Sequence, residues 1–306
     1  MRVALRAGTA LVALLALTAP ADAACIKLGI YQDNVAKTLV PLSKAVGPGI
    51  KTVSVYVTAG TGLDPRLVTL ANSQKLTVLV SWMPDKGKDG PAGKAYSLSN
   101  ISKGKLDAGL RALGVQLRSL KKSAIVRPMP EPNTPWYAWS GTASGNSAAE
   151  YVKAWKHVRG VLRKADPKVR LLWAPYARSV PDTPQNTIAS YFPGPKQVDL
   201  VGASAANFGT SHGLAWSSPS DLFSTAYATI EGLDKKTPFW IAETGSTATG
   251  GDQRGWIQSL GALKKTMPQL TGVVWFDVKD PSGDFRLRAT PAATAAFKGL
   301  LKGACK

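Results

Sequence analysis

Short apolar runs alternate with longer amphipathic stretches along most of the chain, and this alternation limits the possible folds more than any other feature. The apolar runs are rich in valine, isoleucine, leucine and aromatic residues, and eight of them have strand length: 27–31, 52–57, 76–81, 124–127, 170–174, 198–202, 239–243 and 272–276. Nearly continuous apolar runs predict strands buried on both faces, as in a parallel sheet.

The stretches between these runs predict helices. Apolar residues recur at a spacing near 3.6 in five segments: 104–120, 147–164, 220–233, 252–266 and 291–301. Strands that alternate with helices over a chain of this length predict the α/β class and a (β/α)8 TIM barrel in a single domain. A doubly wound open sheet is the alternative, but it more often carries a glycine-rich loop after its first strand, which the sequence LGIYQDN (28–34) lacks.

The first 23 residues have the features of a secretory signal peptide. Arg2 and Arg6 precede a short apolar stretch, and a small-x-small cleavage pattern ends at Ala23. We therefore expect a secreted, extracellular protein, with one domain over 24–306 and no membrane attachment after removal of the signal. A lipoprotein acylated at Cys25 is the weaker alternative, because Asp22 occupies a position that such a signal fills with an apolar residue.

The chain has two cysteines, Cys25 and Cys305, at the two ends of the predicted domain. In an exported protein such a pair predicts a disulfide, with two free thiols as the alternative. A bridge over so long a loop stabilises the fold by about 4–5 kcal/mol in the chain-entropy model. It requires the two ends to be neighbours, as they are in a closed barrel.

The chain is strongly basic, with 38 Lys and Arg against 19 Asp and Glu. This excess indicates attraction to polyanions, and we consider an anionic cell-wall polymer as a partner. The sequence has no basic–aromatic RNA-binding signature and no zinc-finger spacing, so we predict no nucleic-acid partner. A monomer is the simplest expectation.

Two glutamates stand where an apolar run ends and turn residues begin. Glu131 lies in SAIVRPMPEPNTPWYAW (123–139), and Glu243 lies in TPFWIAETGS (237–246). TIM-barrel enzymes place their sites at the carboxyl ends of the strands, and a pair of carboxylates is what glycoside hydrolysis needs. Glu131 and Glu243 are therefore the candidate catalytic residues, with surface or helix-capping glutamates as the alternative.

Sugar rings present flat C–H faces, so carbohydrate clefts use aromatic platforms. Candidate substrate-binding residues at or near the predicted strand ends are Trp82, Arg127, Trp136, Tyr137, Trp173, Asn207 and Trp275, although tryptophans also fill cores. The chain has only two histidines, so we predict no metal site and no cofactor. The absence of a G-x-S-x-G elbow and of a Walker loop excludes two other enzyme classes.

Several segments resemble glycoside hydrolase family 26, best known for endo-β-mannanases. VRPMPEPNTPWYAW (126–139) is similar to its acid/base segment, PFWIAETGS (238–246) to its nucleophile segment and GVVWFDVKDPSGDFRL (272–287) to its eighth strand. The resemblance implies that Glu131 is the general acid/base and Glu243 the nucleophile. It also implies that Trp136 lines the cleft, that Trp275 lies under the reacting sugar and that Arg127 lies below the acid.

Two positions depart from the family pattern. Pro130 stands where the mannanases have a histidine, and Ala206 stands where they have a tyrosine that touches the nucleophile. We therefore predict a secreted retaining endo-glycosidase for a β-linked polysaccharide, of the β-mannan or mixed-linkage β-glucan type. The alternatives are a non-catalytic carbohydrate-binding barrel and a basic polyanion-binding protein, and internal versus terminal cleavage stays open.

Overall fold

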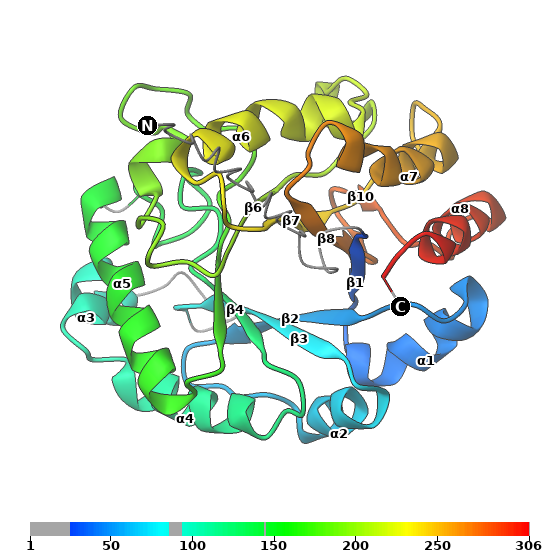
Figure 1. The fold of residues 1–306 in the computed structure, drawn as a ribbon. Coiled ribbons are helices and arrows are strands. Elements are labelled where there is room, and N and C mark those ends of the chain that lie inside the picture. Colours follow the sequence, from blue (N-terminus) through cyan, green and yellow to red (C-terminus); the bar gives the residue numbers. More distant parts are fainter. Residues whose placement is uncertain (1–24, 86–93, 144, 306) are drawn as a thin grey trace, which may run out of the picture.

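The computed structural model describes residues 25–85, 94–143 and 145–305. Eight parallel strands close into a barrel in chain order, as Figure 1 shows, and this confirms the predicted fold class. The strands are β1 (Lys27–Tyr31), β2 (Thr52–Thr58), β3 (Thr77–Met83), β4 (Ile125–Pro128), β5 (Arg170–Trp173), β6 (Leu200–Ser204), β7 (Phe239–Thr244) and β8 (Leu270–Phe276). The predicted signal peptide lies outside the described residues.

Helices surround the barrel: α1 (Val35–Val46), α2 (Pro65–Gln74), α3 (Leu98–Ser102), α4 (Asp107–Arg118), α5 (Ala148–Ala165), α6 (Pro219–Leu233), α7 (Gln253–Ala262) and α8 (Pro291–Lys302). The last five match the predicted helical segments to within a few residues. No predicted range covers α1 or α2, because Pro41 interrupts the pattern of α1 and α2 buries only Leu67 and Ala71. None of the described helices is long and apolar enough to cross a membrane.

The core has an inner part, enclosed by the strands, and an outer part between the strands and the helices. The inner cluster consists mainly of Leu79, Ile125, Leu172, Ala174, Leu200, Trp240, Ala242 and Val274. Side chains alternate between the inside and the outside of a barrel along each strand. Because the inner cluster fills the barrel, polar chemistry is confined to the carboxyl ends of the strands.

A disulfide joins the two ends of the domain. Cys25 and Cys305 are bonded across a sequence separation of 280 residues. The backbone N–H of Cys305 also donates to the carbonyl of Ile26 at 3.1 Å, next to the start of β1. The disulfide prediction is therefore confirmed. The bridge fixes α8, which packs against α1 and α7, to the first strand of the barrel.

Candidate active site

The segment after β4 places Glu131 at the barrel mouth through an unusual backbone. Met129 and Glu131 have φ values of 48° and 55°, in the left-handed region. Such a conformation costs roughly 1–3 kcal/mol for a residue other than glycine, so the surrounding structure must hold it. The N–H of Glu131 donates to the carbonyl of Ala174 at 3.1 Å, and the Thr134 hydroxyl donates to the carbonyl of Glu131 at 2.9 Å.

Three buried side chains brace this segment from below and from the side. The amide of Asn133 accepts from the N–H of Tyr176 at 2.8 Å and donates to its carbonyl at 2.9 Å, which joins the loops after β4 and β5. The indole of Trp139 donates to the carbonyl of Pro130, and the Tyr151 hydroxyl donates to that of Met129. The strained turn therefore has a fixed shape, and the Glu131 side chain points into the mouth, with 7% of its surface exposed.

Glu243 reaches the same mouth through an irregularity in β7. Trp240 and Ala242 belong to the inner cluster, so strict alternation would direct Glu243 outward. The pairing of β7 shifts register between Ile241 and Thr244 against β8, and β6 shifts opposite it. Bulges of this kind re-aim a side chain at barrel rims. Here the shift turns the carboxylate of Glu243 toward the cavity.

One oxygen of Glu243 receives two hydrogen bonds. The hydroxyl of Tyr56, in β2, donates to Oε2 at 2.5 Å, and the guanidinium of Arg127 donates to the same oxygen at 3.3 Å. Arg127 is buried at the end of β4 and also donates to Ser81 at 3.0 Å and to Ser204 at 2.8 Å. These donors stabilise the negative charge of Glu243.

The surroundings of Glu131 have the opposite effect. Burial, and then the charge of Glu243, raise the pKa of the Glu131 carboxyl to about 7, against the smaller opposing effects of Arg127 and of a hydrogen bond from Ser204. Burial, reinforced by the charge of Glu243, also raises the pKa of the Tyr56 hydroxyl well above 10. Near neutral pH the site therefore holds a carboxyl group, Glu131, that can keep its proton and a phenol, Tyr56, that does keep it.

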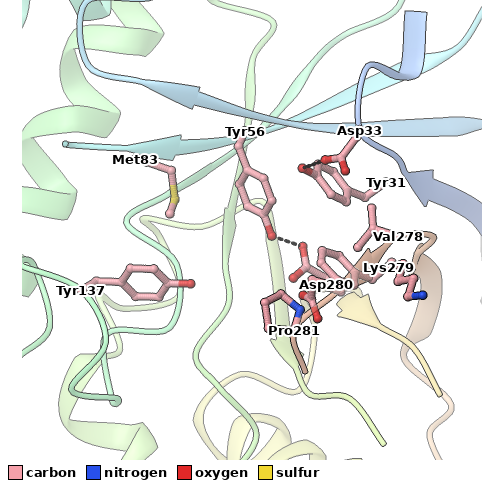
Figure 2. Close-up of a pocket in the computed structure, with 11 residues that line it drawn as sticks. Tyr31, Asp33, Tyr56, Met83, Tyr137, Val278, Lys279, Asp280 and Pro281 are labelled. Atoms are coloured by element: carbon pink, nitrogen blue, oxygen red, sulfur yellow. Dashed lines mark hydrogen bonds between the residues drawn. The ribbon is translucent and has the colours of Figure 1, made fainter. Parts of the chain in front are cut away.

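Two cavities meet at Glu243. The first, of about 530 Å³, is shown in Figure 2 and is also lined by Tyr31, Asp33, Tyr56, Met83, Val278, Lys279 and Pro281. The second, of about 380 Å³, contains Glu131 and a mostly aromatic wall that includes Trp136, Tyr176, Phe208 and Phe285. Both are lined by Tyr137, Glu243, Phe276 and Asp280, so they adjoin across the nucleophile candidate.

Several predicted site residues come together here. Glu131, Glu243, Trp136 and Tyr137 all line the second cavity, and Arg127 lies directly beneath it in contact with Glu243. Trp136 is 52% exposed and packs its ring against Tyr176. Their contact with a sugar stays a prediction.

Four predicted substrate-binding residues lie elsewhere, which corrects that expectation. Trp82, Trp173 and Trp275 are buried in the outer core, and none of them lines either of the two cavities that meet at Glu243. Each follows an inward-facing residue of its strand, so alternation directs it toward the helices. Asn207 is also buried, and its side chain supports a loop by bonding Ser246, Gly209 and Ser217.

The lining contains residues that the sequence reasoning missed: Tyr31, Tyr56, Tyr176, Phe208, Phe276 and Phe285. A signal was present for some of them. Phe276 is one residue beyond Trp275, and strand alternation alone would have selected it. Within the described ranges, no group of three or more His, Cys, Asp or Glu side chains could hold a metal ion.

Comparison with known proteins agrees with the resemblance seen in the sequence. Residues 93–223 match the family model described as glycosyl hydrolase family 26. This region includes Glu131 but ends before Glu243. Endoglucanase H of Acetivibrio thermocellus is 27% identical over 208 residues, which are 66% of this chain but 23% of that protein. The chain therefore spans about a quarter of this relative.

Solved structures share the barrel. The catalytic domain of a Bacillus sp. JAMB-750 family 26 endo-β-1,4-mannanase superposes with a TM-score of 0.70 at 17% identity, over 91% of this chain and 86% of that one. The family 26 domain of a Prevotella bryantii endo-β-mannanase/endo-β-glucanase gives 0.65 at 12% identity, over 90% and 88%. At such identities these structures show the fold alone. The family match and the curated relative agree with the predicted class, an O-glycosyl hydrolase.

Proposed function

We propose that this chain, which carries a glycosyl hydrolase family 26 region, is a secreted retaining endo-glycosidase that acts on a β-linked polysaccharide of the β-mannan or mixed-linkage β-glucan type. The observation that carries the proposal is that Glu131 and Glu243 line one cavity in different surroundings: burial raises the pKa of Glu131, and Oε2 of Glu243 accepts hydrogen bonds from Tyr56 and Arg127. Retaining hydrolysis needs one carboxyl group that gives a proton and one carboxylate that attacks.

In the first step, a carboxylate oxygen of Glu243 forms a bond to the anomeric carbon while the bond to the glycosidic oxygen breaks. The leaving oxygen takes the proton of Glu131, whose pKa of about 7 keeps that proton available near neutral pH. The product is a glycosyl ester of Glu243 and a released chain end.

In the second step, the Glu131 carboxylate takes a proton from water, and the water oxygen displaces Glu243 from the anomeric carbon. The sugar is released with its original configuration, and both glutamates return to their starting states. Arg127 remains charged before and after turnover, because burial alone would lower its pKa but the charge of Glu243 raises it.

The arrangement of the two cavities supports cleavage within a chain. A polysaccharide cut at Glu243 has residues on both sides of the broken bond, and a cavity lies on each side of this carboxylate. The side that contains Glu131 suits the leaving chain, because the proton donor must reach the glycosidic oxygen. Export of the enzyme rests on the signal-like N-terminus and is tested by N-terminal sequencing of the extracellular protein.

The test is hydrolysis of a polysaccharide panel by the wild type and Glu243→Ala. We expect reducing ends to be released from at least one β-mannan or mixed-linkage β-glucan, with a rapid fall in viscosity, and no release by the variant. Normal turnover by Glu243→Ala would contradict the assignment. Binding of a polysaccharide by the wild type without any release would instead identify a non-catalytic carbohydrate-binding barrel, which the alanine at position 206 favours.

A further inference from the structure

The two oxygens of the Glu243 carboxylate have different surroundings. Oε2 accepts hydrogen bonds from Tyr56 at 2.5 Å and from Arg127 at 3.3 Å. In the part of the chain that the structure describes, no hydrogen bond reaches Oε1. A carboxylate held in this way has one fixed oxygen and one oxygen that is available for attack.

Tyr56 is fixed in place as a donor. It belongs to β2, whereas Glu243 belongs to β7, and Figure 2 draws the hydrogen bond from its hydroxyl as a dashed line. Its ring meets the edge of Tyr31 at a centroid distance of 4.8 Å, and Tyr31 in turn stacks on Phe276 at 5.2 Å. This aromatic row leaves the Tyr56 hydroxyl little freedom to leave Glu243.

The geometry points to Tyr56 as the residue that positions the nucleophile, so that Oε1 of Glu243 attacks the anomeric carbon while Oε2 stays bonded to Tyr56 and Arg127. The inference rests on the proposed function and deepens it. In the family pattern a tyrosine after the sixth strand touches the nucleophile, and this chain has Ala206 there. The hydroxyl reaches the carboxylate from the opposite wall of the barrel instead.

The test is Tyr56→Phe, measured beside Tyr227→Phe. Phenylalanine keeps the ring packing and removes only the donor, so we expect kcat to fall about 10- to 100-fold, with KM changed less than about threefold. Tyr227 lies in α6, away from the mouth, and its hydroxyl also bonds a glutamate, Glu231 at 3.4 Å. Tyr227→Phe should leave both constants unchanged.

Two further results separate the positioning role from the proposed function. If Glu243→Ala is inactive while Tyr56→Phe matches the wild type, the positioning role is wrong and the glycosidase assignment stands. If Glu243→Ala is active, the glycosidase assignment itself is wrong. If thermal unfolding showed that the fall in kcat only reflects a smaller fraction of folded protein, Tyr56 would act only by supporting the fold. That result would overturn the inference.

A separate observation concerns the distribution of charge. Residues 98–168 hold 13 Lys and Arg against four Asp and Glu, and Arg127 and Glu131 of the site account for one of each. About a quarter of the chain thus carries an excess of nine positive charges, close to half of the total of 19. From residue 169 onward the two signs nearly balance, with 14 basic and ten acidic residues.

These charges gather on one side of the molecule. The helices α3, α4 and α5 pack together on the outside of the barrel, on the left and lower left of Figure 1. The exposed basic residues of α4, α5 and the loops that adjoin these three helices form what we call the basic wall: Lys103, Lys105, Arg111, Arg118, Lys121, Lys122, Lys153, Lys156, Lys164 and Lys168. The acids nearby are engaged locally, since Asp107 pairs with His157 and Arg111, and Glu150 caps α5.

We infer that the basic wall binds a linear anionic polysaccharide and holds the protein on it while the barrel mouth stays open to its own substrate. The exposed charges of the wall are mainly positive, which complements a polymer with regularly repeated negative charges. Its large aromatic residues, Tyr151 and Trp155, are buried, so it offers no stacking platform of the kind that single-stranded nucleic acids use.

The test is titration of labelled polygalacturonate with two variants that lose the same number of charges. The first replaces Lys121, Lys122, Lys153 and Lys156 by glutamine, and the control replaces Lys235, Lys236, Lys298 and Lys302, which are equally exposed. We expect the wild type to bind with an affinity that falls steeply with salt. The wall variant should lose at least about 10-fold in affinity and the control less than about twofold.

Equal losses in the two variants would show that net charge alone attracts the polymer, and would overturn the inference. So would stronger binding of double-stranded DNA than of polygalacturonate at the same salt concentration, because the wall would then suit a different polyanion. Hydrolysis at the barrel mouth should be the same in both variants, so this test does not depend on the proposed function.

Discussion

The segments that carry Glu131 and Glu243 bring the same functional group to the same place by different means. Glu131 lies three residues past β4, in a turn whose left-handed backbone is held by buried hydrogen bonds from neighbouring loops. Glu243 lies inside β7, where a shift in strand pairing turns a side chain inward that regular alternation would direct outward. The turn after β4 and the bulge in β7 each direct a carboxyl group into the cavity at the barrel mouth, which a regular strand would not do at these positions.

The two segments also differ in the hydrogen-bond donors that surround each carboxyl group. Oε2 of Glu243 accepts from a phenol and a guanidinium, whereas Glu131 lies among Trp136, Tyr137 and Tyr176, with Ser204 as its side-chain donor. The two identical side chains therefore have different surroundings, because Glu243 receives two donors and burial raises the pKa of Glu131. The proposed roles of acid and nucleophile rest on this difference, and it can be tested directly.

The largest expected effect is the loss of the proton donor for a leaving group that needs a proton. Glu131→Ala should lower hydrolysis of a polysaccharide by about 10²- to 10⁴-fold, because the leaving oxygen loses its acid. On an aryl glycoside with a strongly acidic phenol the first step needs no acid, so the variant should form the glycosyl ester at close to the wild-type rate and accumulate it. Glu243→Ala should be inactive on both substrates.

The measurement is a rapid-mixing assay of phenol release by each variant. A burst followed by slow turnover is expected for Glu131→Ala, since it lacks the base of the second step. If the burst appears with Glu243→Ala and not with Glu131→Ala, the roles are reversed and the comparison of the two segments fails.

The second prediction concerns stability. The folded-state pKa of Glu131, about 7, lies above its ordinary value of 4.5, so the folded protein binds more protons than the unfolded chain between these values. Stability then falls as the pH rises through this window, by about 3 kcal/mol for this group. Glu131→Gln, which cannot ionise, should gain stability over the wild type as the pH rises from 4 to 8, as measured by urea unfolding.

The matched comparison is Glu150→Gln, at the exposed start of α5. Glu150 accepts the bonds of a capping box, so its replacement should weaken the helix start, with no gain at high pH. An advantage of Glu131→Gln that stays constant from pH 4 to 8 would mean that Glu131 is not held in its protonated form.

The barrel and both glutamates could be predicted from local sequence, for a physical reason. Buried parallel strands must be apolar along their length, so the runs that became β1 to β8 are visible in the sequence, and Glu131 and Glu243 stand out as charges at the ends of such runs. The disulfide follows equally simply, because closure of the barrel brings its two ends together.

The rest of the site depends on information that is not local. Trp82, Trp173 and Trp275 lie at the right ends of their strands, but their position within the alternation sends them outward. Alternation can be counted, so this error was avoidable. The contact of Tyr56 with Glu243 was not predictable, since it joins residues 187 apart across the barrel, and the bulge in β7 has no distinct sequence signal in FWIAET.

The third prediction compares the last two residues of β8, one of which lines the active-site cavities while the other is buried in the core. Phe276 lines both cavities beside Glu243, whereas Trp275 is buried between Trp256 and Phe297 and bonds the carbonyl of Phe285. Phe276→Ala should lower kcat/KM about 10-fold through loss of an aromatic contact. Trp275→Phe should lower the melting temperature and leave KM unchanged. The opposite result would restore Trp275 as the sugar platform.

The smallest expected effect tests the hydrogen bond from Ser204 to Glu131. Because the proposed acid must be protonated, kcat/KM of the wild type should fall as the pH rises through about 7, the pKa of Glu131. The hydrogen bond from Ser204 lowers that pKa, so Ser204→Ala should raise it and move the alkaline fall of kcat/KM to higher pH, by less than about one unit.

Ser81→Ala is the matched control: Ser81 also accepts from Arg127, at 3.0 Å against 2.8 Å for Ser204, and it makes no bond to Glu131. A shift in Ser204→Ala alone would assign the alkaline fall to Glu131. Equal shifts in both variants would show that the two serines act through the position of Arg127, and would remove Ser204 as a donor that sets the pKa of Glu131.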